Sequence, residues 1–156
     1  MPHDSVTIRQ ATAGDAPAVA ALFLAARQRN LPWLPVVHDD DDVRGWIANV
    51  LVPSGAVWVA TGVDDAPLGF AALTPGWLDH LYVHPDHQGR GVGSRLLAFV
   101  VEREPGALQL WTFQDNAPAR RFYEGRGFVP VEFTDGAENE ERWPDVRYVR
   151  EPGQPG

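Results

Sequence analysis

The clearest chemical signal in the chain is a glycine-rich segment at a predicted strand-to-helix junction. Alternating apolar residues predict a strand over Trp77–Val83, and helical spacing predicts a helix that ends near Arg103. Between them lies Gln88-Gly89-Arg90-Gly91-Val92-Gly93. Glycines in such a loop let successive backbone N–H groups converge on an anion, and the helix dipole adds to the attraction. The segment therefore favours a pyrophosphate ligand, with a plain glycine turn as the alternative.

The same segment does not fit the fingerprint of a dinucleotide-binding site. That fingerprint needs G-x-G-x-x-G, and the residue three positions after Gly91 is Ser94. The anion that the loop binds should therefore belong to another kind of cofactor.

A second pattern surrounds another predicted helix, further along the chain. It consists of Asn116, Ala119, Phe122-Tyr123 and Gly127-Phe128. In order, separation and strand–helix context, this pattern and Gln88-x-x-Gly91-x-Gly93 resemble the two signature motifs of the GNAT acetyltransferases. The stretch that carries the resemblance runs from about Leu68 to Phe128, and the flanking elements fit the fold more loosely.

The resemblance implies acetyl-CoA as the cofactor and a sheet whose fourth and fifth strands splay apart. The pantetheine arm would lie along the backbone of Leu81, Tyr82 and Val83, and Asn116 would touch it. Asn116 could instead serve only as a helix N-cap, and the two roles are compatible. A backbone N–H near Val83 would stabilise the charge on the carbonyl oxygen. The pyrophosphate would lie on the N–H groups of Gln88, Gly89, Arg90, Gly91, Val92, Gly93 and Ser94.

Tyr123 is the residue that we expect to contact the cofactor and to act as the general acid. Attack on a thioester expels a thiolate, which needs a proton. A tyrosine hydroxyl, with a reference pKa of about 10, stays protonated at neutral pH and can donate as the thiolate leaves. The alternative is an aromatic residue that only packs beside Phe122.

The base that takes the proton from an attacking amine is expected on the strand Trp77–Val83, where related enzymes often place it. Asp79 matches one such position and is our predicted base, directly or through a water that it orients. His80 is chemically the better base near neutral pH. Strict alternation, however, would put His80 on the face opposite Asp79, together with Leu78 and Tyr82. A water chain without a dedicated base is a third alternative.

The residues that the chain lacks narrow the chemistry further. It has no Cys, which excludes thiol nucleophiles, disulfides and Cys-ligated zinc. All 13 basic residues are Arg, so the lysines of P-loops and of Schiff bases are absent. Ser5, Ser54 and Ser94 all lie outside any G-x-S-x-G elbow. The composition therefore favours direct attack by the acceptor over a covalent enzyme intermediate.

The net charge of −8 and the pI near 4.9 bear on the partners. An acidic surface repels phosphate backbones, so we expect no nucleic-acid partner. It favours cationic acceptors such as amines, although the charge could serve solubility alone. No apolar run is long enough to cross a bilayer, and the first residues do not form a signal peptide. We therefore expect a cytoplasmic protein without a membrane partner.

Three tryptophans at loop or strand ends are the candidates for an acceptor pocket: Trp33, Trp77 and Trp143. An aromatic wall suits a hydrophobic amine, or a cationic one through cation–π attraction. The acidic loop Asp135–Asp145 would attract the same cation, with ordinary packing as the alternative. His38 stands beside Asp39–Asp42, whose carboxylates suit a helix start better than a metal site. We therefore predict no metal.

The predicted elements give an α+β fold of the GNAT type. We expect a mixed, mostly antiparallel sheet of about seven strands with helices on both faces. Two helices follow the first strand, at about Ala16–Arg27 and Asp39–Val50. A helix precedes the strand Leu108–Thr112, which should therefore run parallel to the fourth strand. Asn116 and Gly127 bound the last helix, and a hairpin closes the chain.

Residues 1–150 are expected to form a single acetyltransferase domain, because 156 residues leave little room for a second. The Pro- and Gly-rich residues 151–156 are expected to be a disordered tail. The predicted function is acetyl-CoA-dependent transfer of an acetyl group directly to a primary amine of a small molecule or a peptide N-terminus. The alternatives are a non-catalytic acyl-CoA-binding or sensing module of the same fold, and transfer of a longer acyl group. A homodimer is compatible with the resemblance.

Overall fold

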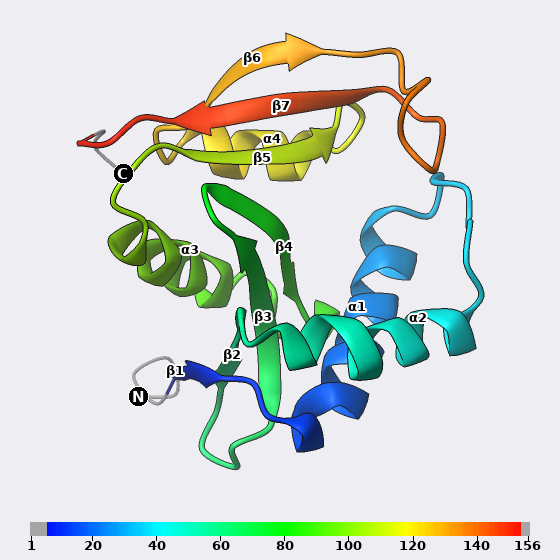
Figure 1. The fold of residues 1–156 in the computed structure, drawn as a ribbon, viewed down its shortest axis with the longest axis vertical. Coiled ribbons are helices and arrows are strands. Elements are labelled where there is room, and N and C mark those ends of the chain that lie inside the picture. The colour runs from blue at the N-terminus through cyan, green and yellow to red at the C-terminus, as the bar shows by residue number, and fades with distance from the viewer. Residues whose placement is uncertain (1–5, 154–156) are drawn as a thin grey trace.

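The computed structural model describes residues 6–153 and contains a seven-stranded sheet with helices on both faces (Figure 1). The strand order is β1-β2-β3-β4-β5-β7-β6, and all neighbours are antiparallel except β4 and β5. This confirms the predicted α+β class and mixed sheet. The strands are β1 (Thr7–Gln10), β2 (Val57–Thr61), β3 (Pro67–Thr74), β4 (Trp77–Val83), β5 (Leu108–Phe113), β6 (Val129–Phe133) and β7 (Asp145–Arg150).

Four α-helices lie within the described residues: α1 (Ala16–Asn30), α2 (Asp40–Trp46), α3 (Val92–Arg103) and α4 (Ala117–Glu124). Asp39 caps α2 through a 2.8 Å hydrogen bond from the backbone N–H of Asp42. The acidic first turn of this helix lies at the positive end of its dipole, as predicted. Shorter helical segments are η2 (Ala13–Asp15), η3 (Ile47–Leu51), η4 (Val52–Ser54) and η5 (Pro85–His87).

Two hydrophobic cores occupy the two faces of the sheet. Successive residues of a strand point to opposite faces, and Ala71 belongs to one core while Phe70 and Ala72 belong to the other. The first core packs α3 and α4 on the sheet, and Leu96 at its centre is fully buried. The second packs α1 and η3 on the other face, around the fully buried Val19. Full burial of each such side chain stabilises the fold by about 1.5–3 kcal/mol.

The sheet opens between its two central strands. β4 and β5 are parallel, as predicted, but they share only one ladder pair, Trp77 with Gln109. The antiparallel pair β5 and β7, by contrast, shares six pairs, from Leu108 to Phe113. Beyond Trp77 the two strands diverge, and Figure 1 shows β4 leaving β5 toward the lower half of the molecule. The predicted splay of the central strands is confirmed.

Several element ends differ from those predicted. The helix α1 continues to Asn30, and the second predicted helix changes at Ile47 into the π-helical turn η3. The last helix ends at Glu124 and not at Gly127, because the Tyr123 carbonyl already accepts from the N–H groups of residues 126 and 128. β7 also inserts between β5 and β6, an order that the sequence pattern does not specify.

The sequence also gave predictions for the C-terminal tail, the domain boundaries and the assembly. Of the predicted tail, Glu151–Gly153 are exposed, whereas residues 154–156 lie outside the described residues. The single-domain boundaries and the homodimer stay predictions. Across residues 6–153, no helix has both the length and the apolar character needed to cross a membrane.

Candidate functional site

The glycine loop after β4 adopts a backbone that favours glycine. Gly89 and Gly91 have φ angles of 79° and 83°, in the left-handed region. A Cβ added at either position would meet no atom within 4 Å, so the backbone and not the space requires glycine. The segment from Gln88 to Gly91 is exposed, and the Gln88 N–H donates to the Pro85 carbonyl at 3.5 Å.

The start of α3 continues this loop. Gly91 is the N-cap of α3, and the first N–H groups of any helix lack partners inside the helix. Ser94, in the first turn, accepts a 2.6 Å hydrogen bond from the Arg126 guanidinium, which lies 4.0 Å above the Phe122 ring. A positive charge that neither sequence motif indicated therefore stands beside the loop. An anion at this end of α3 would meet both the helix dipole and Arg126.

The end of β4 next to the loop is paired on one side only. Leu81, Tyr82 and Val83 pair with β3, and in the described chain they have no ladder partner on the β5 side. The Gln88 side-chain amide donates to the Val83 carbonyl at 3.0 Å and so fixes the loop to the strand. On the β3 side, a Cβ at Gly69 would lie only 2.8 Å from the Tyr82 carbonyl oxygen. Close packing there holds this strand end in place.

The second motif forms α4, on the first core. Asn116 caps the helix by accepting a 3.3 Å hydrogen bond from the Ala119 N–H, which confirms its predicted capping role. Tyr123 lies on the buried face of α4, with its ring centroid 5.2 Å from that of Phe122 and 5.5 Å from that of Phe128. Burial raises the pKa of its hydroxyl above the usual value, and the nearby Tyr82 adds to the rise. The hydroxyl is therefore protonated at neutral pH.

Asp79 lies at a bulge in β4. Ala72 pairs with His80 and the next residue of β3 pairs with Leu78, so Asp79 is left without a partner in the ladder. Its side chain is exposed. Partial burial raises the pKa of this carboxyl, and a hydrogen bond with the Thr74 side chain offsets part of the rise.

The bulge also corrects the predicted faces of β4. Leu78 packs in the first core, together with Leu81 and Val83. His80 and Tyr82 lie on the opposite face, where both rings contact Phe23 of α1. The expectation that Leu78 shares a face with His80 was wrong, because the extra residue in the bulge shifts the alternation by one.

His80 lies among aromatic rings on the second face of the sheet. Its ring centroid is 6.0 Å from that of Phe23, 5.5 Å from that of Trp46 and 6.2 Å from that of Tyr82. Burial, and to a lesser extent the charge of Arg27, lowers the pKa of His80 to about 4. At neutral pH its imidazole is therefore uncharged and can accept a hydrogen bond.

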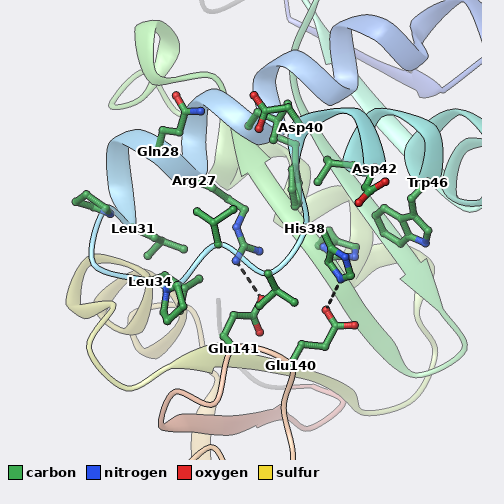
Figure 2. A pocket seen from close by; sticks show the side chains of 18 residues that line it. Arg27, Gln28, Leu31, Leu34, His38, Asp40, Asp42, Trp46, Glu140 and Glu141 are labelled. Carbon is green, nitrogen blue, oxygen red and sulfur yellow. Dashed lines mark hydrogen bonds and ion pairs between the residues drawn. The ribbon is translucent and has the colours of Figure 1, made fainter.

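A cavity of about 730 Å³ opens beside His80. Its walls come from α1, the segment 31–39, α2, and residues Glu140 and Glu141 of the β6–β7 loop. Figure 2 shows these side chains converging from segments that are far apart in the sequence. Most of the lining is apolar: Phe23, Leu24, Leu31, Pro32, Leu34, Pro35, Val36, Val37, Val43 and Trp46.

Two polar contacts, one of them an ion pair, join the walls of the cavity. The Arg27 guanidinium lies 3.2 Å from the Glu141 carboxylate, and both side chains are largely buried. The His38 ring nitrogen Nε2 lies 3.0 Å from the Glu140 carboxylate at the exposed rim. Both contacts are drawn in Figure 2 as dashed lines. They connect the β6–β7 loop to α1 and to the segment 31–39.

The three predicted pocket tryptophans lie outside the lining of this cavity. Trp33 and Trp143 contact one another, with ring centroids 5.4 Å apart, and help to hold the segment 31–39 against the β6–β7 loop. Trp77 lies apart from them, at the start of β4. The tryptophan that does line the cavity is Trp46, which the sequence did not single out. The acidic composition of residues 135–145 did point to this region, because Glu140 and Glu141 line the cavity.

The described residues include no group of three or more His, Cys, Asp or Glu side chains placed to hold a metal. The structure contains two candidate regions for chemistry. The first consists of the glycine loop, the unpaired edge of β4 and Tyr123. The second is the cavity, with His80 in its wall.

Comparison with known proteins gives a consistent result. The sequence profile of the acetyltransferase (GNAT) family matches residues 22–128. The peptidyl-lysine N-acetyltransferase YiaC of Escherichia coli is 30% identical over 126 residues, which cover 80% of this chain and 84% of the relative. The peptidyl-lysine N-acetyltransferase YjaB of Salmonella typhimurium is 35% identical over 77 residues, covering 49% and 52%.

A mycothiol acetyltransferase of Thermobispora bispora is 35% identical over 132 residues, covering 80% of this chain and 41% of the relative. The matched region therefore spans only about half the length of YjaB and 41% of the mycothiol acetyltransferase. Among solved structures, apo-form YjaB from Escherichia coli superimposes with a TM-score of 0.78 at 22% identity, covering 92% of this chain and 96% of that chain. The structure of yncA from Salmonella typhimurium with its cofactor acetyl-CoA gives 0.68 at 21% identity, covering 92% and 91%. At these identities, both structures support the fold.

Proposed function

The chain belongs to the acetyltransferase (GNAT) family, and we propose that it transfers the acetyl group of acetyl-CoA directly to a primary amine. The observation that carries this proposal is the opening of the sheet beside Leu81–Val83. The glycine loop lies at one end of the opening, and Tyr123 lies close enough for Tyr82 to affect its pKa. An unpaired strand edge offers backbone hydrogen bonds to an extended ligand, and a helix start offers them to phosphates.

The loop and the strand edge would hold the cofactor. The N–H groups from Gln88 to Ser94 would bind the pyrophosphate, with Arg126 as an additional positive charge near Ser94. The backbone of Leu81–Val83 would bind the pantetheine arm, and Asn116 would contact it from the start of α4. The free space around Gly89 and Gly91 supports this fit, because no side chain blocks the loop.

Acetyl-CoA supplies a thioester, whose C–S bond breaks as the amine nitrogen forms the new C–N bond. Tyr123 would donate its hydroxyl proton to the leaving sulfur. The raised pKa of Tyr123 keeps that proton in place until the sulfur becomes basic. A backbone N–H near Val83 would stabilise the negative charge that develops on the carbonyl oxygen.

Asp79, or a water that it orients, is the proposed acceptor of the proton that the amine loses. Its raised pKa makes this carboxylate a stronger base than an ordinary one. His80 is the second candidate, favoured by its place in the cavity wall. Comparison of Asp79→Asn with His80→Gln separates the two, because loss of the base lowers kcat, whereas loss of a wall residue mainly raises KM for the amine.

The cavity beside His80 is the proposed acceptor site. Two named relatives are peptidyl-lysine acetyltransferases, whose acceptor is a primary amine. The lining here contains four carboxylates and a single guanidinium, which suits a cationic amine. Trp33 and Trp143 would support this site by holding its two outer segments together.

Calorimetric titration tests the proposal. We expect saturable binding of acetyl-CoA and CoA, and no binding of NAD, because the loop lacks the dinucleotide fingerprint. Release of free thiol from bound acetyl-CoA on addition of an amine would then establish transfer. If neither the thioester nor the thiol bound, the assignment of the loop and of the β4 edge would be wrong.

A further inference from the structure

The cavity beside His80 exposes apolar side chains that a folded chain ordinarily covers. Val36 is 86% exposed, Val37 46% and Trp46 38%, and all three belong to its lining. Exposed apolar surface in a concave site marks a place where an apolar ligand can bind. The ligand should therefore carry an apolar body that covers these side chains.

The charges around the cavity limit what else the ligand can carry. The lining has four carboxylates, of Asp40, Asp42, Glu140 and Glu141. The guanidinium of Arg27 already lies 3.2 Å from one of them, in a pair that is largely buried. Among the described residues no other arginine lines the cavity, His80 is uncharged at neutral pH, and His38 already lies 3.0 Å from the Glu140 carboxylate. A ligand carboxylate would thus meet repulsion without a free cation to bind it.

The position of His80 indicates which end of the ligand faces the acetyl group. His80 lies in β4, two residues before Tyr82. One edge of this strand pairs with β3, and the other edge faces the opening between β4 and β5. His80 is the one described residue of β4 that lines the cavity, so an amine that contacts its imidazole would lie against the strand that borders the opening. The apolar body would then contact Trp46, whose ring lies 5.5 Å from that of His80, and other apolar lining residues such as Val43 and the exposed Val36.

From these contacts we propose that the acceptor is a small primary amine with a compact apolar body and no carboxylate. This inference rests on the proposed acetyl transfer and names its substrate class. The cavity of about 730 Å³ lies in the size range of small-ligand sites. The contacts of Glu140 with His38 and of Glu141 with Arg27, together with the Trp33–Trp143 contact, join the two outer segments around a cavity of this size.

The first test compares acetylation rates over a series of amines at saturating acetyl-CoA. In the series from propylamine to hexylamine, kcat/KM should rise about fourfold per methylene, which corresponds to ~0.8 kcal/mol of transfer free energy. 2-Phenylethylamine should exceed phenylalanine, which adds only a carboxylate to the same body, by at least about tenfold. Equal rates along the series, an equal rate for phenylalanine, or a faster rate for a lysine-containing peptide would each overturn the inference.

The second test uses a matched pair of exposed valines. Val36→Ser removes apolar surface from the cavity, whereas Val63→Ser changes a valine that is 89% exposed and does not line it. Val36→Ser should lower kcat/KM for hexylamine by about threefold to tenfold and leave propylamine within about twofold. Val63→Ser should change neither, and an equal effect of the two substitutions would contradict the inference.

Calorimetry distinguishes failure of the proposed acetyl transfer from failure of the proposed substrate class alone. If acetyl-CoA does not bind, the proposed function fails, and with it the inference. If acetyl-CoA binds and amines are acetylated without regard to apolar length or carboxylate, only the substrate class fails. Direct titration of 2-phenylethylamine into the protein without acetyl-CoA gives a readout that does not depend on catalysis, and absence of binding there would count against the cavity.

Discussion

The proposed cofactor site (the donor side) and the proposed amine site (the acceptor side) are built in different ways. The donor side consists of the glycine loop, the unpaired edge of β4 and α4, which lie in one stretch of sequence around two motifs. The acceptor side is the cavity between α1, α2 and the β6–β7 loop, and its walls come from residues 23–46, His80 and residues 140–141. The first depends largely on backbone geometry and the second on side chains.

This difference explains why one side is readable from sequence and the other is not. Positive φ angles at Gly89 and Gly91 and the cap at Asn116 require particular residue types at fixed spacing. A cavity needs only apolar side chains of suitable size, which many residues can supply. The two sides should accordingly respond to different substitutions, the donor side through cofactor binding and chemistry, the acceptor side through amine binding.

The largest expected effect is that of Tyr123→Phe, on the donor side. Loss of the proton donor should lower turnover by about 10²–10⁴, while the affinity for acetyl-CoA, measured by calorimetry, changes by less than about twofold. Tyr148→Phe is the matched control. That hydroxyl donates to Glu124 at 2.5 Å and accepts from Arg120 at 2.9 Å, so its loss should affect stability and not turnover. Unchanged turnover in Tyr123→Phe would contradict the acid assignment.

On the acceptor side, His80 should make stability depend on pH. Its pKa is about 4 in the folded chain and about 6.5 when unfolded, so the unfolded state binds more protons between these values. The free energy of unfolding should therefore fall by up to about 3 kcal/mol as the pH drops from 6.5 to 4. Urea unfolding at pH 7 and pH 4.5 measures this change. His80→Gln should lose that part of the pH dependence, and an identical slope in both proteins would count against the low pKa.

Gly91→Ala should weaken acetyl-CoA binding on the donor side and leave the acceptor side unchanged. The left-handed backbone costs a non-glycine residue about 1–2 kcal/mol, so the loop should adopt its anion-binding conformation less often. Acetyl-CoA affinity should fall about fivefold to thirtyfold, as measured by calorimetry. Gly106→Ala is the control, because the added Cβ would meet only Glu104 at 3.8 Å and no positive φ is involved. Equal affinities in the two variants would argue against a role for the loop.

Gly136→Ala should weaken amine binding on the acceptor side and leave the donor side unchanged. Gly136 has a φ of 85°, and an added Cβ would lie 2.3 Å from the Trp143 backbone, so the β6–β7 loop that carries Glu140 and Glu141 must shift. We expect KM for the amine to rise about tenfold, the equivalent of ~1.4 kcal/mol, with unchanged acetyl-CoA affinity. Gly76→Ala has a similar φ of 79° without the overlap and should leave KM unchanged. A change in acetyl-CoA affinity in Gly136→Ala would show that the two sides are not separate.

Much of the fold follows from local patterns in the sequence. The bounds of Trp77–Val83 as a strand, the parallel direction of β5 and the capping by Asn116 were predicted from periodicity and capping rules. The insertion of β7 between β5 and β6 was not, because strand order depends on packing between distant segments. The end of α4 at Glu124 was also missed, since the Gly127 signal marks the turn that follows and not the last helical residue.

The candidate site could also be predicted from the sequence only in part. The splay of β4 and β5 was implied by the motifs and is confirmed, whereas the roles of the loop, the β4 edge and Tyr123 stay predictions. The bulge at Asp79 and the place of His80 in the cavity wall could not be predicted, because the bulge breaks the alternation on which the prediction depended. Arg27, Trp46 and Glu141 meet only in three dimensions, and no spacing in the sequence indicates that they do.

The most direct test of direct transfer between the two sides measures products and protein mass together. The protein is mixed with acetyl-CoA alone, and then with acetyl-CoA and 2-phenylethylamine. Free thiol, acetylated amine and the intact mass of the protein are followed in both mixtures. Direct transfer predicts one thiol for each acetylated amine, little thiol without the amine, and an unchanged protein mass throughout. A protein that gains the mass of one acetyl group before the amine is added, or thiol release without acetylated amine, would contradict it.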